Sequence, residues 1–323
     1  MLCCNSNFII SKGIFMNSVT LFYQKHCSPF DRLFYFLLIL TIAVGMLLSL
    51  INQVFTHFIG VAYANWRFFL VIPLLLGLSA LSKLIKYDSP RVYNLIHGYS
   101  QYWVLIIANT MLLQGIQYTP FPTIDTTLAM IDQWLFFDTP QVLKWVYQHK
   151  LDAFLSFFYD SLTYELFFLP GIVGFFIPRS RFKRFLLAYL LATIAAEMIY
   201  YFLPTRAPAS VFTSPYFSEV AQQTHIKFDA VHHAVKYLLP PGTGGLIAFP
   251  SLHVIVGIMY IYLCVDKRWL YFIIGTINVI IILATVMLGW HYLVDLIASI
   301  IISLACIYVS HRWVDHIENK APA

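Results

Sequence analysis

The chain alternates long apolar stretches with shorter polar segments. A helix needs about 20 predominantly apolar residues to cross the hydrocarbon core of a bilayer. Stretches near that length occur at roughly 34–56, 66–86, 101–118, 152–177, 183–203, 247–265, 269–288 and 290–311. The pattern therefore predicts an all-α polytopic membrane protein with about eight transmembrane helices.

These stretches define an expected organisation. We expect a cytoplasmic N-terminal tail at 1–33, two additional transmembrane helices at 34–99, a six-helix core at 100–311 and a cytoplasmic tail at 312–323. The core carries two long loops, at about 119–151 and 204–246. In the first loop, apolar residues over 124–137 recur at intervals of three and four, which predicts an amphipathic helix. Two interpretations stay open for this helix: it lies on the outer membrane surface, where Trp134 would help to admit a lipid, or it packs against the bundle.

Composition supports the membrane class. Hydrophobic residues make up 60% of the chain and charged residues 11%, with a mean hydropathy of +0.74. A soluble domain usually carries about 25% charged residues. A soluble globular protein is therefore excluded.

The basic residues predict the orientation, because Lys and Arg favour cytoplasmic loops. With eight alternating helices, fourteen of the 20 Lys and Arg residues fall on one side and six on the other, although the poorer side has the two longest loops. Both termini are predicted to be cytoplasmic, and the long loops to face the periplasm, the lumen or the exterior. The net charge of +5 follows from this asymmetry and does not indicate nucleic-acid binding. Cys3, Cys4 and Cys27 fall in the N-terminal tail, so no extracytoplasmic disulfide is expected.

Two short motifs carry the candidate chemistry. They are Ala-Phe-Pro-Ser-Leu-His at 248–253 and Gly-Trp-His-Tyr-Leu-Val-Asp at 289–295. A spacing of four places His291 and Asp295 on one helical face, where the carboxylate can orient the imidazole as a nucleophile or base. The alternative is a structural histidine hydrogen-bonded to Asp295. Ionisable residues inside a membrane indicate function by default.

The residues around the histidines suit an anion. Pro250 fits the first position of a helix, whose free N–H groups near Ser251 would attract negative charge. Ser251 adds a hydroxyl donor. Arg206 is the natural bidentate partner of a phosphate, although an arginine at a helix end can also be an interfacial anchor. His253 is the candidate general acid and base. The predicted topology brings these groups to one membrane face.

Other functions were weighed against phosphate chemistry. His253, His291 and Asp295 can in principle bind zinc, but the neighbouring Ser and Arg fit an anion better, so no metal or cofactor is expected. Asp229, His232 and His233 form a second possible metal cluster, for which a surface loop is the simpler interpretation. A transporter or flippase would use the histidines as a proton relay. In a transporter, an ion path would use Asp160, Glu165 and Glu197. Otherwise these acidic residues would form polar contacts between helices or pair with Arg206. A non-catalytic scaffold is a third alternative.

The motif residues resemble the type-2 phosphatidic acid phosphatase superfamily, and within it the inositol phosphorylceramide synthase branch. Pro250 to His253 match the family's Pro-Ser-x-His segment, and His291 to Asp295 match its His-x-x-x-Asp segment. The chain departs from the phosphatase pattern at four positions. Ile199 stands in place of a lysine, and Ala207 separates Arg206 from Pro208. Leu252 replaces a glycine, and Thr285 replaces an arginine.

The resemblance covers roughly residues 100–311 and implies a metal-independent lipid phosphotransferase. His291 would form a phosphohistidine, Arg206 and Ser251 would bind the phosphate, and His253 would protonate the leaving alcohol. The implied partners are a phospholipid donor, a lipid alcohol acceptor and the membrane. A lipid phosphate phosphatase of the same superfamily is the alternative. The oligomeric state, the donor and the acceptor stay open.

Overall fold

The structure is a computed structural model that describes residues 28–56, 67–85, 88–233 and 248–319. Its elements in these ranges are all helical. They are α2 (Pro29–Thr56), α3 (Arg67–Ser82), η1 (Lys83–Ile85), α4 (Pro90–Ile116), α5 (Asp125–Trp134), α6 (Thr139–Gln148), α7 (Asp152–Phe176), α8 (Arg179–Phe202), η2 (Pro208–Ser210), α9 (Glu219–His233), α10 (Leu252–Cys264), α11 (Arg268–Met287) and α12 (Leu293–Asn319).

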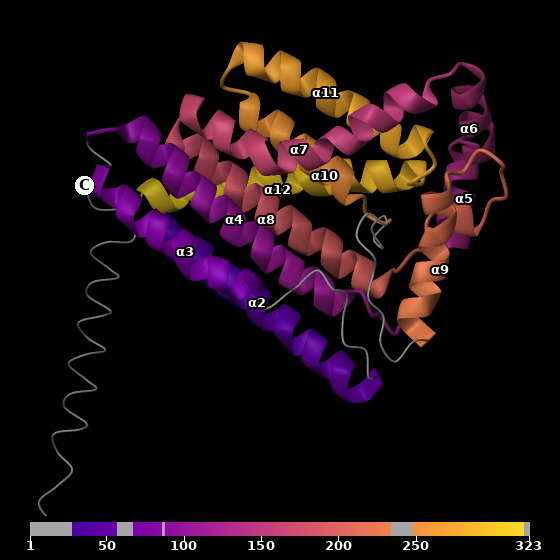
Figure 1. Cartoon of the computed structure of the whole chain (residues 1–323), viewed down its shortest axis with the longest axis horizontal. Coiled ribbons are helices and arrows are strands. Elements are labelled where there is room, and N and C mark those ends of the chain that lie inside the picture. Colours follow the sequence, from indigo (N-terminus) through magenta and orange to yellow (C-terminus); the bar gives the residue numbers. More distant parts are fainter. Residues whose placement is uncertain (1–27, 57–66, 86–87, 234–247, 320–323) are drawn as a thin grey trace, which may run out of the picture.

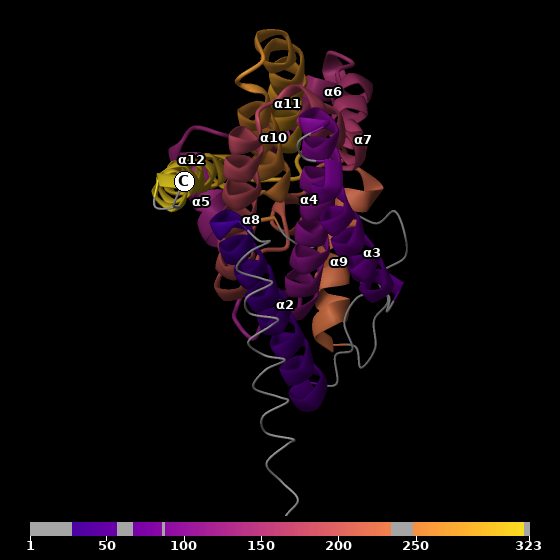
Figure 2. The same ribbon diagram turned by 90° about the vertical axis from the view of Figure 1, so that its left-hand side faces the viewer.

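The long helices form a bundle, and three shorter helices cover one of its ends. Helices α2, α4 and α8 run side by side obliquely across the molecule, while α5, α6 and α9 gather at one end (Figure 1); Figure 2 gives the view from the opposite end. Helix α2 packs along α4, α8 along α12, and α10 along α11. The close approach of α2 to α4 depends on a glycine, because a Cβ on Gly45 would lie 2.6 Å from the carbonyl oxygen of Met111.

Each predicted apolar stretch contains a helix, which confirms the all-α membrane class. Among the described residues, four helices are long and apolar enough to cross a membrane: α2, α8, α11 and α12. Two more apolar helices are shorter, at Val71–Ile85 and Leu252–Cys264. The outer faces carry many exposed apolar side chains, as a lipid-facing surface requires. Examples are Phe36, Leu47, Leu74, Phe157, Phe168, Ile273, Ile301 and Leu304. The number of spans stays a prediction.

Two helices extend beyond the stretches that predicted them. Helix α4 begins at Pro90 rather than near residue 101. The prediction missed its first turns because they carry polar residues, of which His97 and Ser100 are buried. Helix α12 continues to Asn319, through the stretch expected as a tail. The expected boundaries at 99 and 311 thus fall inside helices. The predictions for Cys3, Cys4 and Cys27 lie outside the described residues.

The two long loops contain helices of their own. Helix α5 confirms the amphipathic helix expected within 124–137, and the burial of Leu128, Ala129 and Asp132 supports the packing interpretation. Trp134 and Phe136 at its end are 76% and 98% exposed. Helices α6 and α9 were not foreseen. Helix α9 also buries one face, so the second loop is not simply solvated surface.

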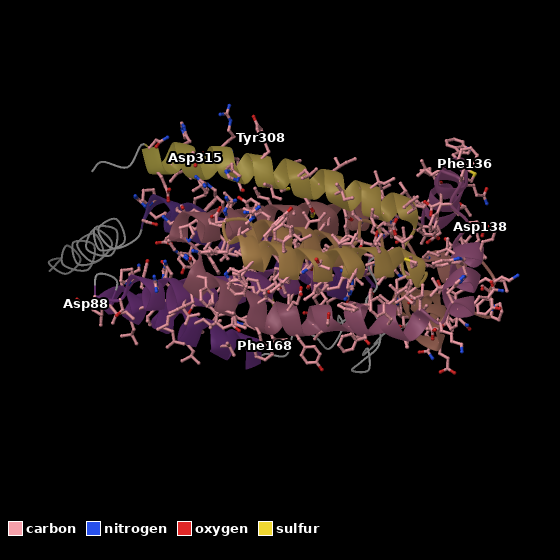
Figure 3. The ribbon with its side chains drawn as sticks, turned by 90° about the horizontal axis from the view of Figure 1, so that it is seen from above. Asp88, Phe136, Asp138, Phe168, Tyr308 and Asp315 are labelled. Atoms are coloured by element: carbon pink, nitrogen blue, oxygen red, sulfur yellow. The ribbon has the colours of Figure 1, made fainter. Side chains whose placement is uncertain are left out.

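The opposite end of the bundle carries a cluster of ion pairs. Arg181 forms a bidentate pair with Asp266, at 2.9 and 2.8 Å. Lys183 and Arg184 lie 2.7 and 2.6 Å from carboxylates near the end of α12. Figure 3 shows the two ends, with Phe136 and Asp138 at one and Asp88 and Asp315 at the other. The basic loops expected to be cytoplasmic therefore lie together.

Candidate active site

The two sequence motifs meet at the end of the bundle that α5, α6 and α9 cover. His291 lies in the turn between α11 and α12 and is 4% exposed. Its Nδ1 is 2.8 Å from the carbonyl oxygen of Ala248. Because a carbonyl can only accept, Nδ1 carries the proton and Nε2 keeps its lone pair. The ring therefore offers Nε2 to a reacting group.

Asp295 and Ser251 complete the surroundings of the imidazole. Asp295 Oδ2 lies 3.3 Å from His291 Nδ1 and accepts the backbone N–H of Tyr292 at 2.9 Å. Ser251 Oγ lies 3.1 Å from Nε2. The expected contact between His291 and Asp295 is thus present. However, His291 precedes α12 instead of lying on it, so the carboxylate reaches back from the first turn of the helix.

The start of α10 differs from the expectation at one residue. Pro250 was predicted at the first helical position, but α10 begins at Leu252 and Ser251 is its N-cap, accepting the N–H of Val254 at 3.4 Å. Side-chain capping satisfies a free N–H group of the first turn, which explains the later start. Ser299 of α12 donates to the carbonyl oxygen of Ser251 at 3.2 Å, so α12 also holds this cap in place.

The turn that presents His291 requires a glycine. Gly289 has a φ of +72°, and a Cβ there would lie 2.7 Å from the ring of Phe217. The N–H groups of Trp290 and His291 both donate to the carbonyl oxygen of Thr285, at 3.1 Å each. Thr285 is fully buried, so the position where related phosphatases carry an arginine supplies no charge here. It supplies the backbone acceptor that closes the turn.

His253 faces His291 across a small cavity. The two ring centroids are 6.2 Å apart. Tyr159 of α7 stacks on His253 at 4.6 Å and on Trp290 at 5.5 Å. The cavity holds about 40 Å³, more than a single water needs. It is lined by Tyr159, Ala207, Thr224, Ala248, His253, Trp290 and His291. Tyr159 was not among the residues singled out in the sequence.

Arg206 lies beside this cavity rather than on its wall. Its neighbour Ala207 lines the cavity, and its own Nη1 lies 3.5 Å from Asp229 Oδ1. Its Nε is buried without a hydrogen-bond partner in the described part of the chain. The acid paired with the arginine is therefore Asp229 of α9, not one of the three membrane acids considered for that role.

Two aspartates of α5 hold the site together and were missed in the sequence. Asp125 accepts the N–H of Arg206 at 3.0 Å and the hydroxyl of Tyr292 at 3.0 Å. Asp132, fully buried, accepts the N–H groups of Leu293 and Val294 at 2.8 and 3.0 Å, and so caps α12. Burial raises the pKa of both carboxyl groups, and the hydrogen bonds they accept act in the opposite direction. Their spacing of seven on one helical face was the available signal.

The remaining acidic residues have separate places. Glu165 accepts an N–H of Asn278 at 2.9 Å, a polar contact between α7 and α11. Asp160 is exposed, and Glu197 is buried in α8.

The second possible metal cluster is not assembled in the described residues. The ring nitrogens of His232 lie 2.7 and 3.1 Å from backbone carbonyl oxygens, and Asp229 faces Arg206. The side chain of His233 lies outside the described residues. No group of three His, Cys, Asp or Glu side chains arranged to hold a metal ion occurs in the described ranges.

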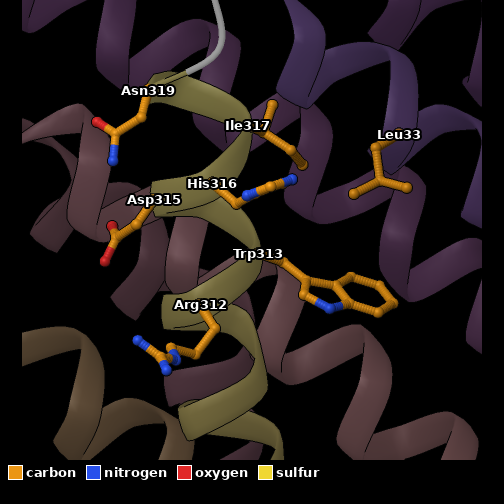
Figure 4. A pocket seen from close by; sticks show the side chains of 7 residues that line it. All are labelled: Leu33, Arg312, Trp313, Asp315, His316, Ile317 and Asn319. Carbon is orange, nitrogen blue, oxygen red and sulfur yellow. The ribbon is translucent and has the colours of Figure 1, made fainter.

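A larger cavity lies elsewhere. It holds about 630 Å³ near the start of α2 and the end of α12 (Figure 4). Its wall includes Leu33, Arg312, Trp313 and His316 and none of the candidate site residues. The candidate site is therefore defined by the convergence of the two motifs and not by the size of its cavity.

The family comparison agrees with the motif geometry. The model of the PAP2 superfamily matches residues 126–309, more than half of the chain, and this protein belongs to that superfamily. The matched region runs from α5 to α12 and includes the residues placed at the site above, except Asp125, which lies one residue before it. Membership supports an enzyme of the phosphatase or phosphotransferase type acting on lipid phosphates in membranes. Neither the curated proteins nor the solved structures gave a match.

Proposed function

We propose that this protein is a lipid phosphotransferase that moves a phosphoryl-headgroup between lipid alcohols through a phosphohistidine on His291, as an inositol phosphorylceramide synthase does. The observation that carries the proposal is the state of the imidazole. Its Nδ1 proton is directed at Ala248 and Asp295, while Nε2 points to Ser251 and borders the cavity shared with His253. A nucleophile needs this arrangement, with the proton held on Nδ1 and a lone pair on Nε2, to which only the Ser251 hydroxyl hydrogen-bonds among the described residues, at 3.1 Å.

The first step cleaves the donor. His291 Nε2 attacks phosphorus, the bond from phosphorus to the lipid oxygen breaks, and His253 gives its proton to the departing alkoxide. The imidazolium that forms is stabilised by Asp295 through Nδ1. The Ser251 hydroxyl and the Arg206 guanidinium stabilise charge on the phosphate oxygens. No metal ion is needed for any of these roles.

The second step reverses the first with a different alcohol. His253, now neutral, takes the proton of the acceptor hydroxyl as that oxygen attacks phosphorus, and the bond from phosphorus to His291 breaks. If water takes the place of the alcohol, the same residues hydrolyse the phosphate. His291 is 4% exposed, which limits the access of bulk water. The polar end with the site is proposed to face the periplasm or lumen, and the basic end the cytoplasm.

One experiment tests the function. Purified protein is incubated in mixed lipid with EDTA, with and without ceramide or diacylglycerol, and all phosphorus-containing products are followed by mass spectrometry. A new headgroup-bearing lipid that is absent with His291→Ala supports the proposal. His149→Ala is the matched control, because His149 is exposed at the end of α6 and is not among the residues that line the cavity. Free phosphate as the sole product would indicate a phosphatase, and no turnover under any lipid condition would contradict the proposal and favour transport.

A further inference from the structure

A lysine of α9 stands out because it is buried without a partner. Lys227 is 3% exposed, and its Nζ has no hydrogen-bond partner within the described residues. Lysine is almost never fully buried unless it is paired, because an isolated ammonium loses its hydration. A buried unpartnered ammonium therefore indicates a missing anion.

Lys227 lies on the same face of α9 as Thr224, one turn further along the helix, and is not itself among the residues that line the histidine cavity. Helix α9 buries Ala221, Thr224, Lys227, Phe228 and Val231 along one face. Thr224 lines the cavity together with His253 and His291. Side chains on a helix lean toward its N-terminus, so a lysine covers the turn before its own Cα. The ammonium of Lys227 is thus carried back toward the level of Thr224.

The site is short of positive charge without this lysine. Arg206 precedes Ala207 of the cavity lining, and its guanidinium is already 3.5 Å from Asp229. Thr285 and Ile199 supply no charge where a related phosphatase would carry cations. A phosphoryl group in transit spreads negative charge over several oxygens, and one shared arginine leaves much of it unbalanced.

We propose that Lys227 is a phosphate-binding residue of the histidine site, whose ammonium contacts a phosphate oxygen of the bound lipid. The proposal rests on the proposed function and adds to it a cation from α9, a helix outside the motifs. Burial lowers the pKa of Lys227 in the free protein, and a phosphate oxygen nearby favours the protonated form again. Phosphate binding and the charge of this lysine are therefore linked.

The test uses inorganic phosphate as the probe, independently of any lipid reaction. Thermal unfolding of the purified protein is measured over increasing phosphate, with chloride at matched ionic strength. Ligand that binds only the folded state raises the unfolding temperature. Lys227→Met keeps the length of the side chain and removes the charge. Because Lys227→Met loses a charge-assisted hydrogen bond to phosphate, we expect its phosphate Kd to rise about 10- to 100-fold. The KM for lipid substrate should rise by a similar factor.

Two controls separate binding from structure. Lys144→Met removes an exposed charge at the same end of the molecule and leaves the phosphate Kd unchanged. Without phosphate, Lys227→Met unfolds at the same or a higher temperature than the wild type, because it removes an unpaired buried charge. A lower unfolding temperature would mean that Lys227 has a structural ion partner and would overturn the proposal.

The outcomes also separate this inference from the proposed function. If Lys227→Met loses phosphate affinity while no lipid is turned over, the anion site stands and phosphotransfer fails. If lipid is turned over and Lys227→Met keeps its KM and phosphate Kd, the enzyme stands and Lys227 is excluded. Absence of any phosphate-dependent shift in the wild type also overturns the role of Lys227.

Discussion

Replacing Asp132 should lower turnover more strongly than it lowers the stability of the bundle. Asp132 is fully buried in α5, and its carboxylate accepts the first two N–H groups of α12. Asp132→Ala leaves both donors without an acceptor. A buried donor that loses its partner costs about 1–3 kcal/mol, so the start of α12 should lose about 2–4 kcal/mol, allowing for partial relaxation.

Turnover should respond more strongly than stability. His291 lies two residues before Leu293, so any loosening of the first turn of α12 moves the nucleophile. A displacement of about 1 Å can cost about 100-fold in rate, and we expect kcat to fall about 10- to 100-fold. Asp132→Asn keeps one acceptor oxygen and should lose less in both respects, which provides a test if the alanine variant does not fold.

The assay compares kcat and thermal stability in detergent for both variants and for a matched control. Asp138→Ala also removes a helix cap, the one that accepts the N–H of Gln141 at 3.0 Å. That cap is exposed and starts α6, which carries no residue of the cavity lining, so it should cost about 1 kcal/mol and leave kcat unchanged. A folded Asp132→Ala protein with the kcat of Asp138→Ala would refute the reasoning.

Three further outcomes are expected. Gly289→Ala should lower stability by about 1–3 kcal/mol and reduce turnover, since its positive φ and the ring of Phe217 leave no room for a Cβ; thermal unfolding and kcat measure this, and wild-type values for both would contradict the packing of the turn. Tyr159→Phe should keep most activity because stacking on His253 needs only the ring, whereas Tyr159→Ala should lose at least half; equal kcat for the two variants would exclude a stacking role. EDTA should leave the rate of lipid turnover unchanged, and a loss restored by added zinc would show that His253 and His291 bind a metal.

Part of this architecture follows directly from the sequence. Apolar runs of bilayer length predicted eight helices because a backbone in hydrocarbon must satisfy its hydrogen bonds within the segment. The motif residues Ser251, His291 and Asp295 were predicted to act together. In the structure His291 lies 3.1 Å from Ser251 and 3.3 Å from Asp295.

The supporting residues were harder to predict for a physical reason. Asp132 lies in the amphipathic helix that periodicity predicted, but periodicity does not show which polar residue of that helix is buried. Lys227 lies in α9, which has few apolar residues and was not predicted. Their importance depends on what lies opposite them, and the N–H groups capped by Asp132 come 161 residues later in the chain. Contacts at that separation are set by how helices pack, which local patterns do not encode. The start of α10 was misplaced at Pro250 because serine capping competed with proline at the helix entry.

The cap that Asp132 of α5 forms on α12 also affects the order in which the protein can assemble. The chain emerges from the ribosome N-terminus first, so α5 exists long before α12. Until the last helix enters the membrane, Asp132 has no amide groups to accept and His291 has no Asp295 behind it. Under the proposed function, we therefore expect a chain to become active only after α12 has joined the bundle. A chain that stops before α12 should accumulate, if at all, as an inactive membrane intermediate.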